Sequence, residues 1–146
     1  MRKEIIDNLV AEKQLRVRQL DVERILSIIN SAVTNAKVSK GIRLNDDSAT
    51  VVFRELYESV RQLGDACWWI EGYEPLNHEI SLEILKELDI KNKIKLNHLY
   101  RFKKIRNDAN YRGFRVSVSQ AKEVIEFWDT CGKEILGIIS KRIRQR

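Results

Sequence analysis

The chain has 146 residues, 33% of them charged and 43% hydrophobic, and its 27 Lys and Arg against 21 Asp and Glu give a net charge of +6. This length predicts one domain with one core, while one proline, six glycines and evenly spread apolar residues exclude collagen-like, low-complexity and disordered chains. No apolar stretch approaches the roughly 20 residues of a membrane span, and residues 1–10 lack the apolar run of an export signal, so we expect a cytoplasmic protein without a membrane partner.

The first twenty residues give a mixed pattern. Apolar residues in the first half have helical spacing, whereas Leu15 and Val17 in the second half alternate with arginines. We interpret residues 1–20 as an N-terminal helical arm. Residues 21–146 are expected to form a single helical-bundle domain, because no linker or internal repeat divides them.

Two long amphipathic helices are predicted next. Asp21 can cap a helix whose apolar residues repeat at three and four positions and which ends before Gly41. Asp47 or Ser48 begins a second helix, which runs to about Gly72. At roughly 1.5 Å per residue, this second helix would span the whole domain.

Three further helices complete the chain. Asn77 can cap a short helix, and a basic helix then ends between Asn110 and Gly113. Ser117 and Gln120 match a capping box at the start of a final long helix. Because hairpin turn signals are absent, the sequence predicts an all-α fold, an antiparallel up-and-down bundle of about five helices.

The cysteines and histidines give no sign of a metal site. Cys67 and Cys131 stand among apolar neighbours and belong to no C-x-x-C pair, which favours two buried free thiols. His78 and His98 have no second His or Cys three or four positions away. Glycine-rich phosphate loops and nucleophile-elbow motifs are also absent. We therefore expect neither a metal nor a cofactor.

The three tryptophans are expected to differ in their surroundings. Trp128 lies on the apolar stripe of the last helix, which favours a place in the core. Trp68 and Trp69 are adjacent, and neighbouring residues on a helix cannot both face one core. We expect one of the two to point outward, into a dimer interface.

The positive charge is concentrated in two segments. Residues 91–115 contain nine cations and one anion, a net charge of +8, and residues 141–146 add +4. The rest of the chain is therefore acidic. A concentrated positive field is what a phosphate backbone or an acidic partner selects, although a solvated helix face is an equally good explanation of the clustering alone.

The end of the basic helix carries a cluster of polar side chains. Arg106 and Asn110 are four residues apart and project from the same face, with Tyr111 just beyond. A guanidinium beside an amide and a phenol suits a phosphate or the edge of a nucleotide. The alternative is structural: Arg106 would bind the end of a neighbouring helix, and Asn110 would cap its own helix.

Four segments carry a further pattern: Leu-Tyr-Glu-Ser-Val-Arg-Gln-Leu at 56–63, Gly-Tyr-Glu-Pro-Leu-Asn-His-Glu at 72–79, Arg-Asn-Asp-Ala-Asn-Tyr at 106–111 and Val-Ser-Val-Ser-Gln-Ala-Lys at 116–122. Together they resemble the HEPN domain of bacteria and archaea, in matching helix order over roughly residues 21–137. The resemblance implies an all-α bundle, commonly a homodimer whose arginine-bearing helices face a shared basic cleft. Many relatives are encoded beside a minimal nucleotidyltransferase, as toxin and antitoxin.

Catalytic HEPN proteins are metal-independent endoribonucleases with an R-x4-6-H motif. Their arginine stabilises the phosphate, and their histidine is the acid or base during attack by the ribose 2′-hydroxyl. By this resemblance Arg106 matches the arginine and Asn107 the polar residue after it. The histidine has no counterpart, because four, five or six intervening residues after Arg106 lead to Tyr111, Arg112 and Gly113, respectively. A phenol, with an ordinary pKa near 10, is a poor proton shuttle at neutral pH.

The sequence leaves three functions open. The first is a homodimeric HEPN module that binds RNA, or the nucleotide of a partner nucleotidyltransferase, in a cleft lined by Lys103, Arg106, Asn107, Asn110 and Arg112. The second is an active metal-independent endoribonuclease that uses Arg106 and Tyr111, or a residue of the other subunit. The third is a non-enzymatic interaction module whose basic face docks an acidic partner.

Overall fold

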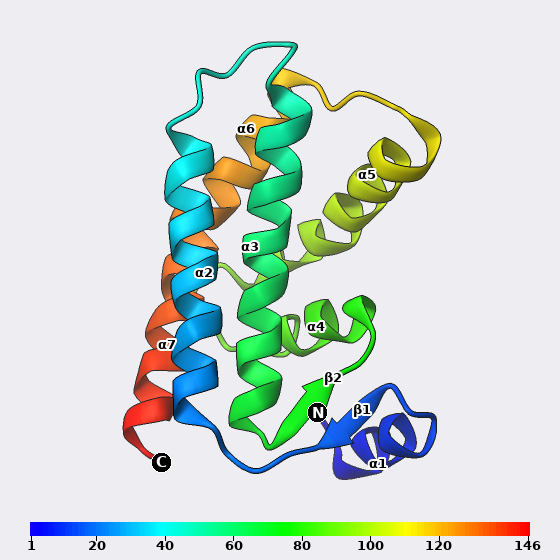
Figure 1. The fold of residues 1–146 in the computed structure, drawn as a ribbon, viewed down its shortest axis with the longest axis vertical. Coiled ribbons are helices and arrows are strands. Elements are labelled where there is room, and N and C mark those ends of the chain that lie inside the picture. The colour runs from blue at the N-terminus through cyan, green and yellow to red at the C-terminus, as the bar shows by residue number, and fades with distance from the viewer.

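The computed structural model describes residues 1–146 and is mostly helical, with six helices and one two-stranded antiparallel sheet (Figure 1). The first five helices are α1 (Lys3–Ala11), α2 (Val22–Lys40), α3 (Ala49–Ile70), α4 (His78–Leu85) and α5 (His98–Arg112). The sixth consists of α6 (Val118–Phe127) and α7 (Lys133–Arg144), joined by a π-helical turn over Trp128–Gly132. None of these helices combines the length and apolarity that crossing a bilayer requires.

The core is arranged around α3. Helix α2 lies beside α3 and runs in the opposite direction, and α4, α5 and α6 pack on its other sides (Figure 1). The predicted core position of Trp128 is confirmed, and both Cys67 and Cys131 are buried and unpaired, as predicted. Because neighbours surround α3, its residues are buried on nearly all sides.

Three predicted helix starts are confirmed by their caps. The Asp21 side chain accepts a hydrogen bond from the backbone N–H of Arg24 at 3.0 Å, and Asn77 caps α4 in the same way. Ser117 and Gln120 form the expected capping box at the start of α6. The second long helix begins at Ala49, without a side-chain cap from Ser48. These local signals therefore mark where three of the helices begin.

The small sheet corrects the all-α prediction. Strand β1 (Leu15–Val17) pairs antiparallel with β2 (Tyr73–Pro75), so that Arg16 lies opposite Glu74. Leu15 and Val17 do alternate with arginines, but this alternation is too short to predict a strand, and the partner strand lies far away in the sequence. Within the predicted N-terminal arm only Lys3–Ala11 is helical, and the division at residue 20 stays a prediction.

The expectation for the tryptophan pair was wrong. Trp68 is 0% and Trp69 6% exposed, so neither points into solvent. The indole N–H of Trp68 donates to the backbone oxygen of Ile80 in α4 at 2.7 Å. On another side of α3, the guanidinium of Arg24 lies 4.9 Å from the centre of the Trp69 ring. A helix covered from several directions buries adjacent residues, and the pair therefore gives no support to a dimer interface.

Candidate functional site

Helix α5 presents its basic face outward because its apolar face is anchored in the core. The Phe102 ring packs edge-on against Phe53 of α3 and Phe127 of α6, with ring centres 5.9 and 5.6 Å apart. The helix ends at Gly113, whose φ of 69° lies in the left-handed region that favours glycine. The predicted end between Asn110 and Gly113 is thereby confirmed.

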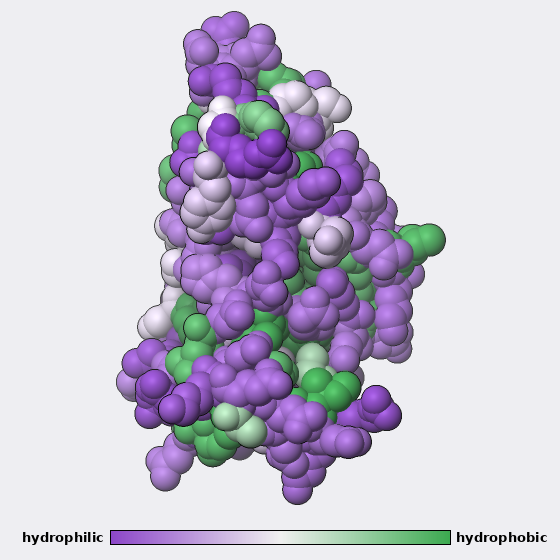
Figure 2. All heavy atoms as spheres, turned by 90° about the vertical axis from the view of Figure 1, so that its right-hand side faces the viewer, coloured by the Kyte–Doolittle hydropathy of each residue, from purple (hydrophilic) through white to green (hydrophobic).

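A hollow of about 280 Å³ lies where α4 and α5 approach each other beside α3. We call it the Arg106 hollow. It is lined by Tyr57 of α3, by Asn77, His78 and Glu79 at the start of α4, and by Lys103, Arg106, Asn107 and Tyr111 of α5. Figure 2 shows the side of the molecule that carries α4 and α5, and its surface is mainly hydrophilic there.

Arg106 is a half-buried cation without an anionic partner. Its Nη1 donates to the side-chain oxygen of Asn107 at 3.2 Å, and its guanidinium lies 5.8 Å from the centre of the Tyr57 ring. No carboxylate lies within ion-pair distance of it. The structural alternative is not observed, because Arg106 binds no helix end and Asn110 makes no side-chain hydrogen bond.

Tyr57 forms the buried side of the hollow. Burial raises the pKa of its phenol to about 12, although the nearby positive charge of Arg106 acts in the opposite direction. The phenol therefore keeps its proton at neutral pH and adds no negative charge beside Arg106. Its ring gives the guanidinium a flat apolar surface.

The rim of the hollow is held by one ion pair between α4 and α5. The ammonium of Lys103 lies 2.7 Å from a carboxylate oxygen of Glu79. Tyr111 stands at the rim with 76% of its surface exposed, and the imidazole of His78 is exposed as well. Two cations and one carboxylate leave the hollow with a net charge of +1.

The structure brings together four of the residues expected at the site, namely Lys103, Arg106, Asn107 and Tyr111. Asn110 and Arg112 do not line the hollow. The guanidinium of Arg112 instead lies 4.7 Å from the centre of the Phe114 ring and 3.9 Å from a carboxylate oxygen of Asp108. The guanidinium of Arg112 therefore contacts residues at the end of α5 and does not reach the Arg106 hollow.

His78 was not predicted as a site residue, because the R-x4-6-H motif places its histidine just after the arginine. It lies 28 residues earlier in the chain and enters the hollow from the first turn of α4. Its segment, 72–79, belonged to the HEPN resemblance, but sequence spacing cannot show that α4 faces α5. Only the packing of both helices against α3 brings the imidazole to this hollow.

The ion pairs of the basic segment distinguish Arg106 from its neighbours. Five of the nine cations in residues 91–115 pair with carboxylates, namely Lys95, Arg101, Lys103, Arg112 and Arg115. Lys91, Lys93 and Lys104 are unpaired but exposed. Arg106 alone is both unpaired and partly buried, and among the four unpaired cations its charge is therefore the least screened by solvent.

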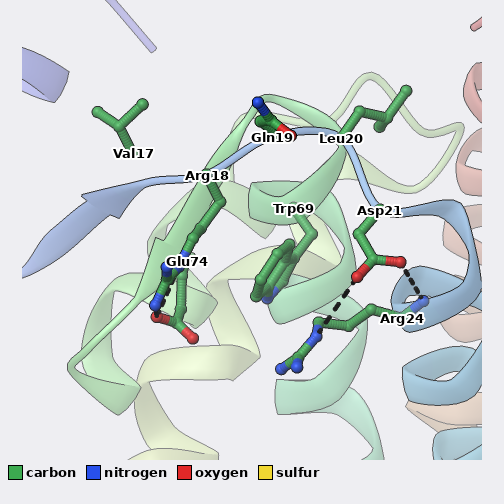
Figure 3. Close-up of a pocket in the computed structure, with 8 residues that line it drawn as sticks. All are labelled: Val17, Arg18, Gln19, Leu20, Asp21, Arg24, Trp69 and Glu74. Carbon is green, nitrogen blue, oxygen red and sulfur yellow. Dashed lines mark hydrogen bonds and ion pairs between the residues drawn. The ribbon is translucent and has the colours of Figure 1, made fainter.

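A larger hollow lies between β1 and α2, with a volume of about 630 Å³ (Figure 3). Its two arginines are already paired. Arg18 lies 3.1 Å from Glu74, and Arg24 lies 3.9 Å from Asp21. Trp69 lies between the two arginine side chains (Figure 3). Although larger, this hollow is lined by two arginines and two carboxylates whose charges sum to zero, so the Arg106 hollow, with one cation in excess, is the stronger candidate for an anion site.

The Arg106 hollow combines a guanidinium, two side-chain amides, two phenols, an imidazole and the ion pair of Lys103 with Glu79. Such groups suit an anion that accepts several hydrogen bonds, of which a phosphate is the common biological case. No group of three or more metal-ligating side chains is present. Comparison with known protein families, curated proteins and solved structures finds no match to this chain.

Proposed function

We propose that this chain is a HEPN-type helical protein that binds the phosphate groups of RNA, or of a nucleotide, in the Arg106 hollow. The observation that carries the proposal is the half-buried, unpaired guanidinium of Arg106. The helix order supports it, since α2, α3, α5 and the last helix alternate in direction, as in an up-and-down bundle (Figure 1).

The charge of the hollow suits a phosphodiester. Because Glu79 neutralises Lys103, the net positive charge of the hollow is the single charge of Arg106. A phosphodiester carries one negative charge, and its two non-bridging oxygens match the forked donors of a guanidinium. Asn107 holds the fork in place through its side-chain oxygen, and its amide nitrogen is a further donor.

The proposal includes a homodimer and a minimal nucleotidyltransferase as partner, both on the strength of the HEPN resemblance. In that arrangement the α5 helices of two subunits would face a shared basic cleft. Sedimentation at micromolar concentration measures the first of these. A dimer of the 17.2 kDa chain is expected, and a monomer would contradict this part of the proposal.

The binding site is tested with Arg106→Ala and a labelled single-stranded RNA. We expect at least about a tenfold loss of affinity, because a charged hydrogen-bonding group contributes roughly 1.5–3 kcal/mol, together with a shallower salt dependence. Arg144→Ala is the matched control, since Arg144 is an exposed arginine without an ion pair in the other basic segment. Equal affinity of both variants and the wild type would overturn the site assignment.

A second candidate is a metal-independent ribonuclease, which the position of His78 favours. Its imidazole would accept the proton of a ribose 2′-hydroxyl as the 2′-oxygen bonds to phosphorus. The bond from phosphorus to the 5′-oxygen then breaks, and that oxygen takes a proton from Tyr111. Arg106 would stabilise the charge on the phosphate, and the products are a 2′,3′-cyclic phosphate and a 5′-hydroxyl.

This candidate requires cleavage in excess chelator that is lost in both Arg106→Ala and His78→Gln. His98→Gln is the matched control, because His98 is the other histidine and stacks on Phe102, away from the hollow. Cleavage that survives His78→Gln but disappears in Tyr111→Phe would mean that Tyr111 acts without His78. RNA binding without any cleavage would leave only the binding function.

A further inference from the structure

Two exposed aromatic rings lie on the outer face of α5. Tyr100 is 67% and Tyr111 76% exposed. They are 11 residues apart, which is three helical turns and about 20° of rotation, so they share one face at a separation of roughly 16 Å along the axis. Single exposed aromatic residues are common, but two rings aligned on one face beside a cationic hollow need an explanation.

On this outer face, the residues between the two rings are polar or cationic. Lys104 and Asn107 complete the same face, and Lys104 is exposed without an ion pair. The ammonium groups of Lys86 and Lys103 each lie 5.9 Å from the centre of the Tyr100 ring. We call Tyr100, Lys104, Asn107 and Tyr111 the α5 stripe. Asn107 and Tyr111 also line the Arg106 hollow, so the stripe and the hollow are continuous.

Phe114, just after α5, is an exposed aromatic ring that already has a cation against it. The guanidinium of Arg112 lies 4.7 Å from the centre of its ring and occupies that contact. Tyr111 has no ring or cation against it, and Tyr100 is 67% exposed despite its two ammonium contacts. Tyr111 is therefore open to a flat ligand, and Tyr100 offers a largely exposed ring flanked by cations.

We infer that the α5 stripe is a stacking platform for single-stranded RNA, with bases on Tyr100 and Tyr111 and an intervening phosphate in the Arg106 hollow. Aromatic platforms interleaved with cations bind single strands, because every unpaired base offers a flat face to a ring. A duplex hides those faces within its own stack, so double-stranded RNA is excluded from this mode. The inference rests on the proposed phosphate site and adds the strandedness of its ligand.

Three probes of equal length test it by fluorescence anisotropy: a labelled ten-nucleotide oligoadenylate, the same backbone with abasic residues, and a ten-base-pair RNA duplex. Stacking of one base on each of the two rings predicts that the wild type binds the oligoadenylate at least about 30-fold more tightly than the abasic strand. Equal affinity for the two single strands, or tighter binding of the duplex, would overturn the inference.

Tyr100→Leu is the informative variant, because Tyr100 lies outside the Arg106 hollow and its side chain is exposed. It should weaken oligoadenylate binding at least about fivefold and leave abasic binding unchanged. Tyr100→Phe should restore wild-type affinity, since it keeps the ring. Val38→Ala, at an exposed position on α2, is the control and should change nothing.

The failures of the two proposals are distinguishable. If Tyr100→Leu binds like the wild type while Arg106→Ala binds weakly, the phosphate site stands and the stacking platform is wrong. If the wild type binds none of the three probes, the phosphate site itself is wrong. A single-stranded DNA of the same sequence shows whether the ribose contributes, and preference for DNA would also overturn an RNA ligand.

Discussion

The contact between α3 and α4 and the Arg106 hollow each contain an arginine, but the two guanidinium groups have opposite surroundings. Arg61 of α3 lies 2.5 Å from Glu58 and 2.8 Å from Asp65, so two carboxylates saturate it. Arg106 of α5 contacts only a neutral amide and a phenol ring. Both arginines are partly buried, and only one of them has its charge matched within the chain.

The matched arginine belongs to a network that fixes α4 against α3. Asp65, which accepts a hydrogen bond from Arg61, also accepts one from the hydroxyl of Ser81 in α4 at 2.5 Å. Burial raises the pKa of the Asp65 carboxyl, and the charge of Arg61 opposes that shift. The comparison teaches that a saturated arginine serves the fold, whereas an unsaturated one of similar burial is available to a ligand.

The largest expected effect is at Gly64, where α3 and α4 meet backbone to backbone. A Cβ added there would lie 1.8 Å from the backbone oxygen of Ser81, so α4 must move and the hydrogen bonds of Asp65 and Trp68 to it weaken. We expect Gly64→Ala to lower the free energy of unfolding by about 3–5 kcal/mol, from overpacking and weakened hydrogen bonds together. Urea unfolding followed by circular dichroism measures this.

Gly137→Ala is the control for that prediction. No atom lies within 4 Å of a Cβ at Gly137, which stands inside α7. Alanine should there raise the free energy of unfolding by roughly 0.5–1 kcal/mol, because glycine is a poor helix former. If both variants unfold at the same urea concentration, the close approach of α3 to α4 is wrong.

The helices were predictable because their signals are local. Asp21, Asn77 and Ser117 each bind a backbone N–H two or three residues away, so a short stretch of sequence contains the whole interaction. The sheet and the burial of Trp69 depend on segments that meet only in the folded chain. A periodicity argument has no access to such contacts.

The residues of the candidate site also form two groups, one predictable from local sequence and one brought in by tertiary packing. Lys103, Arg106, Asn107 and Tyr111 are neighbours on one helix, and their grouping follows from helical geometry. Tyr57 and the residues of α4 reach the hollow through tertiary packing. Charge counting likewise found the basic segment, but it could not show which of its cations the fold neutralises.

The second prediction sets Arg61→Ala against Arg106→Ala. Arg61→Ala should lower the free energy of unfolding by about 2–3 kcal/mol, because Asp65 loses its cationic partner in a partly buried place. Arg106→Ala should change it by no more than about 0.5 kcal/mol, since no charge is left unpaired. Thermal unfolding measures both variants, and RNA titration below the unfolding temperature should give the reverse order of effects.

The two variants are informative together because stability loss and affinity loss are expected to rank them in opposite orders. Arg61→Ala is expected to keep wild-type RNA affinity while folded, and Arg106→Ala to lose at least about tenfold. If the two variants lose similar stability and similar affinity, saturation of the guanidinium does not separate a structural arginine from a binding one.

The smallest effect concerns Tyr57, which belongs to α3 but forms the buried side of the Arg106 hollow. Because burial raises the pKa of its phenol from 10.0 to about 12, the unfolded chain releases this proton first as the pH rises. The unfolded state then binds fewer protons than the folded one, so stability falls above about pH 10. Two pKa units correspond to about 2.7 kcal/mol once both states are ionised.

Tyr57→Phe isolates this contribution, because the other alkaline titrations are common to both proteins. The variant should therefore lose less stability than the wild type between pH 8 and pH 11, by up to about 1.5 kcal/mol, since the unfolded phenol is ionised at pH 11 and the folded one mostly is not. Urea unfolding at the two pH values measures the difference. Parallel losses in the two proteins would mean that the phenol is solvated, and that the hollow is open beneath Arg106 rather than closed by the Tyr57 ring.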